Sequence, residues 1–149
     1  MKSVLLLLIM PFMLFAQSKK DSIRVFYLGG QSNMEGFGYV NELPDSLKKK
    51  YKNVFIYQGN PTADNDKSGG LGKWDLLQAG HGTGFSSDGK SNTLSDRFGV
   101  ELSLAKRLQE LYPNQKIAFI KYARNGSSID SIGTHGFGAW EPDFKGGKG

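Results

Sequence analysis

The stretch from residue 98 to residue 123 constrains the fold of this chain most. Between residues 98 and 112, apolar side chains recur every three or four positions, which predicts an amphipathic helix; they are Phe98, Leu102, Ala105, Leu108 and Tyr112. Ser95 or Asp96 could cap the start of this helix. The apolar run "KIAFIKYA" at residues 116–123 then predicts a strand. A helix followed directly by a strand is half of a β-α-β unit, from which parallel sheets are built.

Two further apolar runs predict strands. Residues 23–30 read "IRVFYLGG", with four apolar side chains in a row, and residues 53–59 read "NVFIYQG". An uninterrupted apolar run is typical of a strand covered on both faces, as in a parallel sheet. Three strands and one helix predict an α/β fold, but such a sheet ordinarily has more of both. We therefore expect only the N-terminal half of an α/β domain, in which residues 116–123, if left without a neighbour, would form an aggregation-prone edge.

The first sixteen residues have the pattern of a secretory signal peptide. Lys2 provides a positive start, residues 4–15 are apolar, and Ala16 is a small residue before the polar "QSKKD". The apolar run is shorter than the roughly twenty residues of a membrane-spanning helix. We expect residues 1–16 to be removed and residues 17–149 to form the N-terminal portion of one domain. The mature chain would have no membrane span and would be secreted or periplasmic.

The composition excludes several classes of protein. The chain of 149 residues has no cysteine, which excludes a disulfide scaffold, a thiolate zinc site and a cysteine nucleophile. Its formal net charge is +5, but the only dense basic run is residues 46–52, which we interpret as a solvated face. Nucleic-acid binding is not expected. Residues 64–75 nearly match the spacing of a calcium loop but have Asp at position 12 and no flanking helices, so we predict a polar loop and no metal.

One serine lies where the predicted fold makes chemistry possible. The sequence "GGQSNMEG" at residues 29–36 follows the first predicted strand, and sites in open α/β sheets form at the carboxyl ends of strands. The stretch lacks the Lys of a phosphate-binding loop and is neither a G-x-G-x-x-G nor a G-x-S-x-G motif. From the residues alone, Ser32 is either a nucleophile or the cap of a short helical turn.

Three stretches together resemble the SGNH/GDSL hydrolase superfamily, and within it the branch of sialate O-acetylesterases and carbohydrate esterase family six. "GGQSNMEG" resembles the nucleophile motif G-Q-S-N-M, and "RFGVELSLAKRL" at residues 97–108 resembles the F-G-x-E-L helix. "KYARNGSSID" at residues 121–130, with Trp140 and Pro142, resembles the segment K-x-A-x-G-G-T-S-I…W-x-P. The resemblance implies a three-layer, SGNH-hydrolase-like (flavodoxin-like) fold with a parallel sheet. It implies a serine esterase that removes O-acetyl groups from carbohydrates, of the sialate or xylan type, without a cofactor.

Carried over by position, the resemblance makes Ser32 the nucleophile. Its own backbone N–H and that of Gly126 would form the oxyanion hole. The family has two glycines where this chain has Asn125 and Gly126. Because Asn tolerates positive φ better than most residues, we expect the turn to persist.

The resemblance also assigns supporting positions. Gln31 and Asn33 are expected to hold the loop, and Glu101 is interpreted as a structural hydrogen-bonding residue rather than a catalyst. Trp140 lies in a loop beside the predicted site, where it would either stack on a sugar ring of the acetylated carbohydrate or pack over the end of the sheet.

The general base is missing from the motifs. The family supplies it with an Asp-x-x-His pair, and a further oxyanion contact with a Q-G-E motif, and neither occurs in this sequence. The only histidines are His81 and His135, which could reach Ser32 in principle but are otherwise ordinary loop residues. We expect an N-terminal fragment of a longer enzyme, with little esterase activity by itself. The alternative is a non-catalytic, glycan-binding remnant of the same fold.

Overall fold

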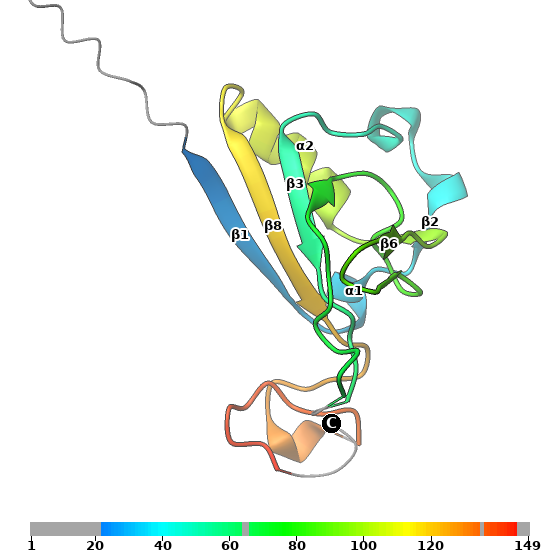
Figure 1. Cartoon of the computed structure of the whole chain (residues 1–149), viewed down its shortest axis with the longest axis vertical. Coiled ribbons are helices and arrows are strands. Elements are labelled where there is room, and N and C mark those ends of the chain that lie inside the picture. The colour runs from blue at the N-terminus through cyan, green and yellow to red at the C-terminus, as the bar shows by residue number, and fades with distance from the viewer. Residues whose placement is uncertain (1–21, 64–65, 135, 146–149) are drawn as a thin grey trace, which may run out of the picture.

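A computed structural model describes residues 22–63, 66–134 and 136–145. The predicted signal peptide, His135 and the first two residues of the calcium-like loop lie outside the described residues. The described part consists of a sheet with a helix against it and a loop-rich lobe formed after the end of the last strand (Figure 1). None of the described helices is long and apolar enough to cross a membrane.

In the described part of the chain, the main sheet has four strands in the order β1-β8-β3-β4. Strands β1 (Ile23–Gly30), β8 (Lys116–Ala123) and β3 (Val54–Gln58) are parallel, with β8 in the middle. The short strand β4 (Asp75–Leu76) pairs antiparallel with β3, so the sheet is mixed rather than purely parallel. The three predicted strands are thus confirmed.

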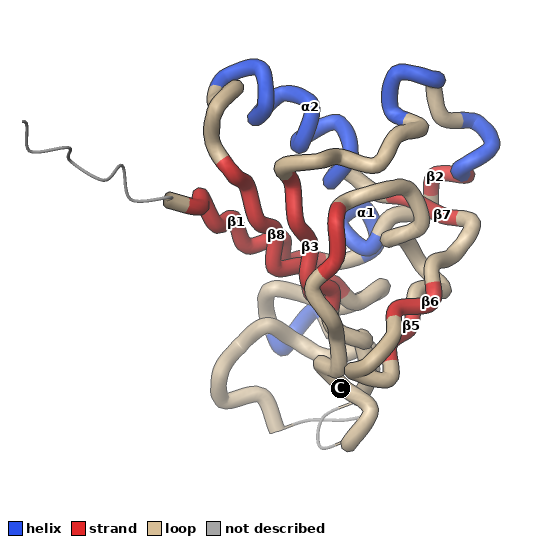
Figure 2. The backbone as a smooth tube through the Cα atoms, turned by 45° about the horizontal axis from the view of Figure 1, so that its top comes forward, coloured by secondary structure: helices blue, strands red, loops and turns tan. Residues whose placement is uncertain are grey.

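Helix α2 (Glu101–Leu111) covers one face of this sheet, as Figure 2 shows. Its buried side chains include Leu102, Ala105 and Leu108, three of the five predicted positions. They pack in one core with strand residues such as Ile56 and Phe119. The periodicity therefore predicted correctly which side of this helix faces the sheet.

The start of the helix was predicted wrongly. Phe98 belongs to strand β7 (Arg97–Phe98), which pairs antiparallel with β2 (Gly38–Tyr39), and Val100 occupies the cap position without a side-chain hydrogen bond. Ser95 does not cap the helix, because its hydroxyl accepts a hydrogen bond from the Arg97 N–H at 3.1 Å. Pairing of β7 with β2 keeps this stretch extended, so the helix begins later in the chain, at Glu101.

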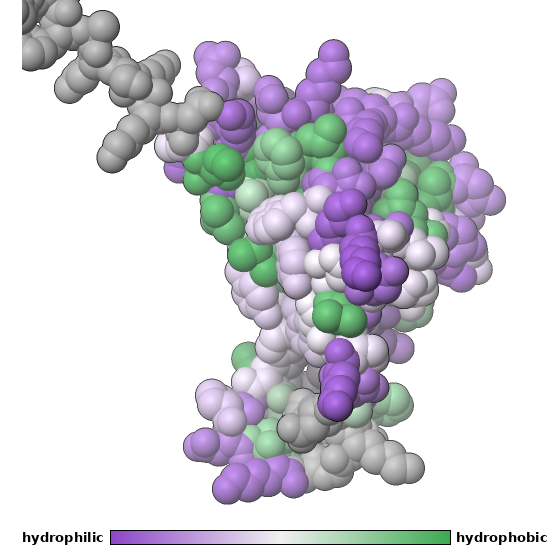
Figure 3. All heavy atoms as spheres, viewed as in Figure 1, coloured by the Kyte–Doolittle hydropathy of each residue, from purple (hydrophilic) through white to green (hydrophobic). Residues whose placement is uncertain are grey.

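Within the described residues, the opposite face of the sheet is open, and the expectation for β1 was wrong. Strand β1 is not covered on both faces: Val25 and Tyr27 are 58% and 60% exposed, whereas Leu28 is buried. Residues 116–123 are not left without a neighbour, because β8 pairs with a strand on each side; the described edges are β1 and β4. Figure 3 shows apolar side chains gathered on this side of the molecule. Among the described residues α2 is the helix that covers the sheet, so the expected three-layer arrangement is not confirmed.

The connections contain short elements. A one-turn helix α1 (Ser32–Glu35) follows β1, and strand β5 (Ser86–Ser87) pairs antiparallel with β6 (Asn92–Thr93). Three 3₁₀ turns complete the described elements: η1 (Val40–Glu42), η2 (Asp45–Leu47) and η3 (Ser131–Gly133).

Candidate active site

Ser32 lies in residues 29–36, the Ser32 loop, which runs from the carboxyl end of β1 through α1. The backbone N–H groups of Met34 and Glu35 donate to the Gln31 carbonyl at 2.9 and 2.8 Å, and the Gly36 N–H donates to the Ser32 carbonyl at 2.9 Å. The Ser32 hydroxyl donates to the side-chain oxygen of Gln31 at 2.6 Å. Gln31 occupies the cap position, and Ser32 is the first helical residue. The interpretation of Ser32 as a helix cap is therefore wrong.

The loop is packed tightly against the segment that precedes α2. Gly36 has φ 98°, and a Cβ atom there would lie 2.5 Å from the backbone of Gly99. Only glycine avoids both the strained dihedral and this clash. The Gly36 carbonyl also accepts the Thr83 N–H at 2.8 Å. The end of the Ser32 loop is thus attached to two distant segments.

A second turn lies at the same end of the sheet. The Arg124 N–H donates to the Gly30 carbonyl at 3.0 Å, which joins the end of β8 to the end of β1. The turn closes through the Ser127 N–H and the Arg124 carbonyl at 3.3 Å, with the positive φ, 76°, at Gly126. The Asn125 N–H donates to the Glu35 carboxylate at 2.6 Å. These contacts bring the predicted oxyanion turn to the predicted nucleophile loop.

The two predicted oxyanion donors have no partner within the described residues. Neither the backbone N–H of Ser32 nor that of Gly126 donates to another described residue, whereas the N–H groups of Arg124, Asn125 and Ser127 all do. A free backbone donor at a strand end is what an oxyanion hole requires. Within the described part of the chain, these two donors are thus not used by the fold.

A buried lysine, Lys121, hydrogen-bonds to three segments around the site. Lys121, on β8, donates through Nζ to the Glu101 carboxylate at 2.8 Å and to the carbonyls of His81 and Glu35 at 2.5 and 3.1 Å. Glu101 also accepts the Gly99 N–H at 2.8 Å. Glu101 therefore bonds to the Lys121 ammonium group and to the backbone before α2. The Ser32 hydroxyl bonds to Gln31 instead. Buried charges persist when they are paired and hydrogen-bonded in this way.

His81 is buried, and the bond of the Ser32 hydroxyl goes to Gln31 rather than to this imidazole. Its Nδ1 lies 3.0 Å from the side-chain oxygen of Gln58, and its ring stacks on Phe85 at 5.1 Å. Its Nε2 has no hydrogen-bond partner among the described residues. Burial, and then the positive charge of Lys121, lower the pKa of His81 to about 4. The expectation that His81 could reach Ser32 finds no support in this geometry, and His135 lies outside the described residues.

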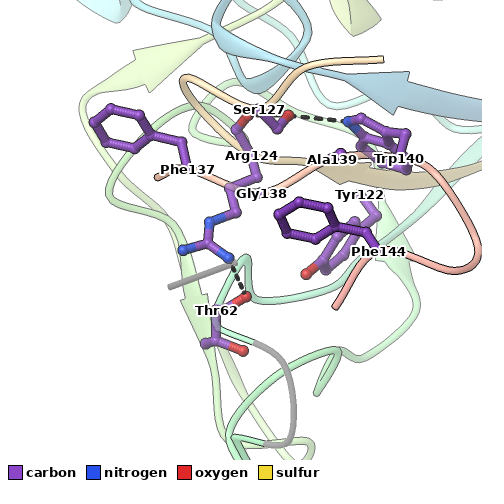
Figure 4. Close-up of a pocket in the computed structure, with 9 residues that line it drawn as sticks. All are labelled: Thr62, Tyr122, Arg124, Ser127, Phe137, Gly138, Ala139, Trp140 and Phe144. Atoms are coloured by element: carbon purple, nitrogen blue, oxygen red, sulfur yellow. Dashed lines mark hydrogen bonds between the residues drawn. The ribbon is translucent and has the colours of Figure 1, made fainter. Parts of the chain in front are cut away.

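Trp140 lies beside the end of β1 and lines two hollows. Its indole N–H donates to the Ser127 hydroxyl at 2.9 Å, and its ring packs edge-on against Tyr122 at 6.0 Å. The smaller hollow, about 90 Å³, appears in Figure 4 with Trp140, Ser127 and the Arg124 guanidinium, which donates to the Thr62 carbonyl. The larger, about 410 Å³, is lined by Tyr27, Gly29, Gly30, Gln31, Ser127, Ile129 and Trp140.

Asn33 is exposed and faces a different hollow. This open depression of about 510 Å³ is lined by Asn33, Gly36, Phe37, Gly38, Phe98, Gly99, Val100 and Ser103. Gln31 has clear contacts within the loop, and no described contact of the Asn33 side chain holds the loop together. The sequence motifs gave no role to Glu35 or Lys121, although Glu35 lies in "GGQSNMEG" and Lys121 begins "KYARNGSSID".

Comparisons with known proteins place the chain in a family. Residues 22–139 match the family model described as carbohydrate esterase, sialic acid-specific acetylesterase, which confirms the resemblance carried by the three motifs. No curated protein is a significant match. Two solved structures are similar at 17% identity and a TM-score of 0.47 each: the carbohydrate acetylesterase XAC1771 from Xanthomonas citri and NanS.

The chain spans less than half the length of these two proteins. The similarity covers 72% of this chain and 23% of XAC1771, and 83% of this chain and 44% of NanS. The family match itself covers most of the chain, including the Ser32 loop, Glu101 and the turn at Gly126. This chain therefore belongs to the family of carbohydrate esterases described as sialic acid-specific acetylesterases.

Proposed function

We propose that Ser32 is the nucleophile of a carbohydrate O-acetylesterase and that the N–H groups of Ser32 and Gly126 form its oxyanion hole. One observation carries the proposal: the bonds from Arg124 to Gly30 and from Asn125 to Glu35 hold the Gly126 turn against the Ser32 loop. Both segments follow adjacent parallel strands, where sites of α/β folds form. The family match supports the class of reaction.

The proposed reaction has two steps. Ser32 Oγ attacks the carbonyl carbon of the acetyl ester while a base removes its proton. The negative oxygen that develops accepts from the two N–H groups, a contribution whose loss lowers the rate about 10²–10³-fold per donor. The bond to the sugar oxygen breaks, that oxygen takes the proton, and water then hydrolyses the acetyl-serine to release acetate.

We propose that the base is supplied from outside the described residues. Within them the Ser32 hydroxyl donates to Gln31, an amide that cannot act as a base near neutral pH. The family motif for this role is an Asp-x-x-His pair, which this sequence lacks. The 149-residue chain would accordingly have little esterase activity by itself.

We propose that an acetylated sugar occupies the hollow of about 410 Å³ beside Gln31. Tyr27 and Trp140 border it, and Trp140 is 37% exposed, which leaves part of the indole for stacking on a pyranose ring. The indole is held in place by its bond to Ser127. The shape of the loops around this hollow would determine which acetylated carbohydrate binds, a sialate or a xylan-like sugar.

The test compares acetate release from 4-nitrophenyl acetate by the 149-residue chain and by its Ser32→Ala and His135→Ala variants. For the 149-residue chain, we expect turnover close to that of Ser32→Ala. For the product of any longer reading frame that encodes Asp-x-x-His, we expect turnover that depends on Ser32. Robust turnover that both variants abolish would assign the base to His135. Turnover that survives Ser32→Ala would remove Ser32 from the mechanism.

The second candidate is glycan binding without catalysis. It is favoured by one observation: the hollow bordered by Trp140 lies beside a serine that has no base among the described residues. Calorimetry with O-acetylated sialic acid distinguishes the two. Binding that Trp140→Ala weakens, with no acetate released by any form of the protein, supports the remnant.

We also propose that the protein acts outside the cytoplasm, as a secreted or periplasmic protein. The support is the signal-like sequence of residues 1–16. N-terminal sequencing of the protein recovered from the cell exterior or periplasm should begin at Gln17. A product that retains Met1 and stays in the cytoplasm would contradict the proposal.

A further inference from the structure

We propose that Glu35 is a positioning residue that orients the Gly126 N–H toward the Ser32 loop, an inference that rests on the proposed function. Glu35 is only 8% exposed. Its carboxylate accepts the Asn125 N–H at 2.6 Å across 90 residues of sequence. Charge-assisted hydrogen bonds of this length are about twice as strong as neutral ones.

The bond to Glu35 selects one donor in the turn. The N–H groups of Arg124, Asn125 and Ser127 donate to the Gly30 carbonyl, the Glu35 carboxylate and the Arg124 carbonyl. The Gly126 N–H is the remaining donor of this turn and bonds to no described residue. The Asn125 N–H belongs to the rigid peptide plane before the one that carries the Gly126 N–H, and the Ser127 N–H belongs to the plane after it. Bonds on both sides therefore restrict the direction of the Gly126 N–H. Glu35 therefore keeps Asn125 out of the oxyanion hole and holds Gly126 in it.

Glu35 is itself part of the nucleophile loop. Its N–H donates to the Gln31 carbonyl at 2.8 Å, and its carbonyl accepts from Lys121 Nζ at 3.1 Å. The backbone of Glu35 is thus fixed on both sides, and its side chain transmits that position to the turn. One residue connects the nucleophile and the second oxyanion donor, so the two cannot shift independently.

The first readout is backbone amide exchange measured by NMR, which needs no catalytic activity. The proteins are the wild type, Glu35→Gln, Glu35→Ala and a control, Glu42→Gln, which removes an exposed carboxylate from η1. We expect the Asn125 amide to exchange about tenfold faster or more in Glu35→Ala, with a smaller effect in Glu35→Gln, whose amide oxygen still accepts. The Gly126 amide resonance should shift in both, and Glu42→Gln should match the wild type.

The second readout is the rate at which a fluorophosphonate labels Ser32. If the wild type is labelled, the rate should fall in the order wild type, Glu35→Gln, Glu35→Ala, with Glu42→Gln unchanged. If the wild type is not labelled, the result agrees with a Ser32 that has no base within the described residues, and amide exchange alone decides the role of Glu35. Unchanged Asn125 exchange and Gly126 shift in Glu35→Ala would overturn the inference. Changes in Glu35→Gln spread equally over β8 and α2 would also overturn it, because they indicate a general structural role.

Discussion

Lys121 and Glu101 form an ion pair at 2.8 Å in the interior, with 1% and 0% of their side chains exposed. The pair joins β8 to the first residue of α2. The same ammonium group also reaches the carbonyls of Glu35 and His81, so it holds four segments around the end of the Ser32 loop. Removing either partner leaves a buried charge without compensation.

We predict that Lys121→Met lowers the free energy of unfolding by about 3–5 kcal/mol, because the Glu101 carboxylate stays buried and unpaired. Urea denaturation measures the loss. The matched control is Arg107→Met, which breaks the exposed 2.9 Å pair with Glu110 and should cost less than about 1 kcal/mol. Equal losses in the two variants would show that burial of the first pair is unimportant.

Gly126→Ala should lower the free energy of unfolding more than Gly70→Ala does. Gly126 has φ 76°, and a Cβ there would lie 2.7 Å from the Phe137 ring. Gly70 has φ 66° with nothing within 4 Å of a Cβ, so Gly70→Ala carries the dihedral strain alone. We expect about 1–2 kcal/mol for Gly70→Ala and more for Gly126→Ala, measured by thermal or urea unfolding. Similar values would mean that Phe137 moves aside without cost.

The two faces of β1 give a paired prediction. Leu28 is 4% exposed and belongs to the core, whereas Val25 is 58% exposed on the open face. Leu28→Ala should lower stability by about 2–5 kcal/mol. Val25→Ala should change it by about 0.5 kcal/mol or less. A large loss in Val25→Ala, measured by urea unfolding of the same 149-residue chain, would show that the open face is covered in solution.

Stability should fall as the pH drops from about 6.5 to about 4 because of His81. The pKa of His81 is lowered from 6.5 to about 4 in the folded protein, so in this window the unfolded chain binds the extra proton. Stability from this group is complete above pH 6.5 and is lost progressively toward pH 4, a change on the order of 3 kcal/mol. Urea midpoints at pH 7, 5.5 and 4 measure it.

His81→Gln is the control for that prediction, since Gln does not titrate and can still donate to Gln58. The variant should lose part of the pH dependence between pH 6.5 and 4. If the wild type and His81→Gln show the same decline, other groups cause it and the buried state of His81 is not the source.

Much of the local structure was predictable from short stretches. The apolar run of residues 116–123 coincides with β8, and the helical period located the buried face of α2. The start of α2 was not predictable, because the pairing of Arg97–Phe98 with Gly38–Tyr39 overrides the local pattern. The open face of β1 was missed for a similar reason: an apolar run does not reveal which of its sides finds a neighbour.

By itself, the sequence determined the elements whose signals are local and the family to which the three motifs belong. Ser32 and Gly126 were named from those motifs, and the tertiary structure decided that their loops touch and that their N–H groups bond to no described residue. It also decided that Glu35 binds Asn125, that Lys121 and Glu101 are buried together, and that His81 is buried against Gln58. Such contacts join residues 20 to 90 positions apart, and they depend on how strands and helices pack rather than on any local pattern.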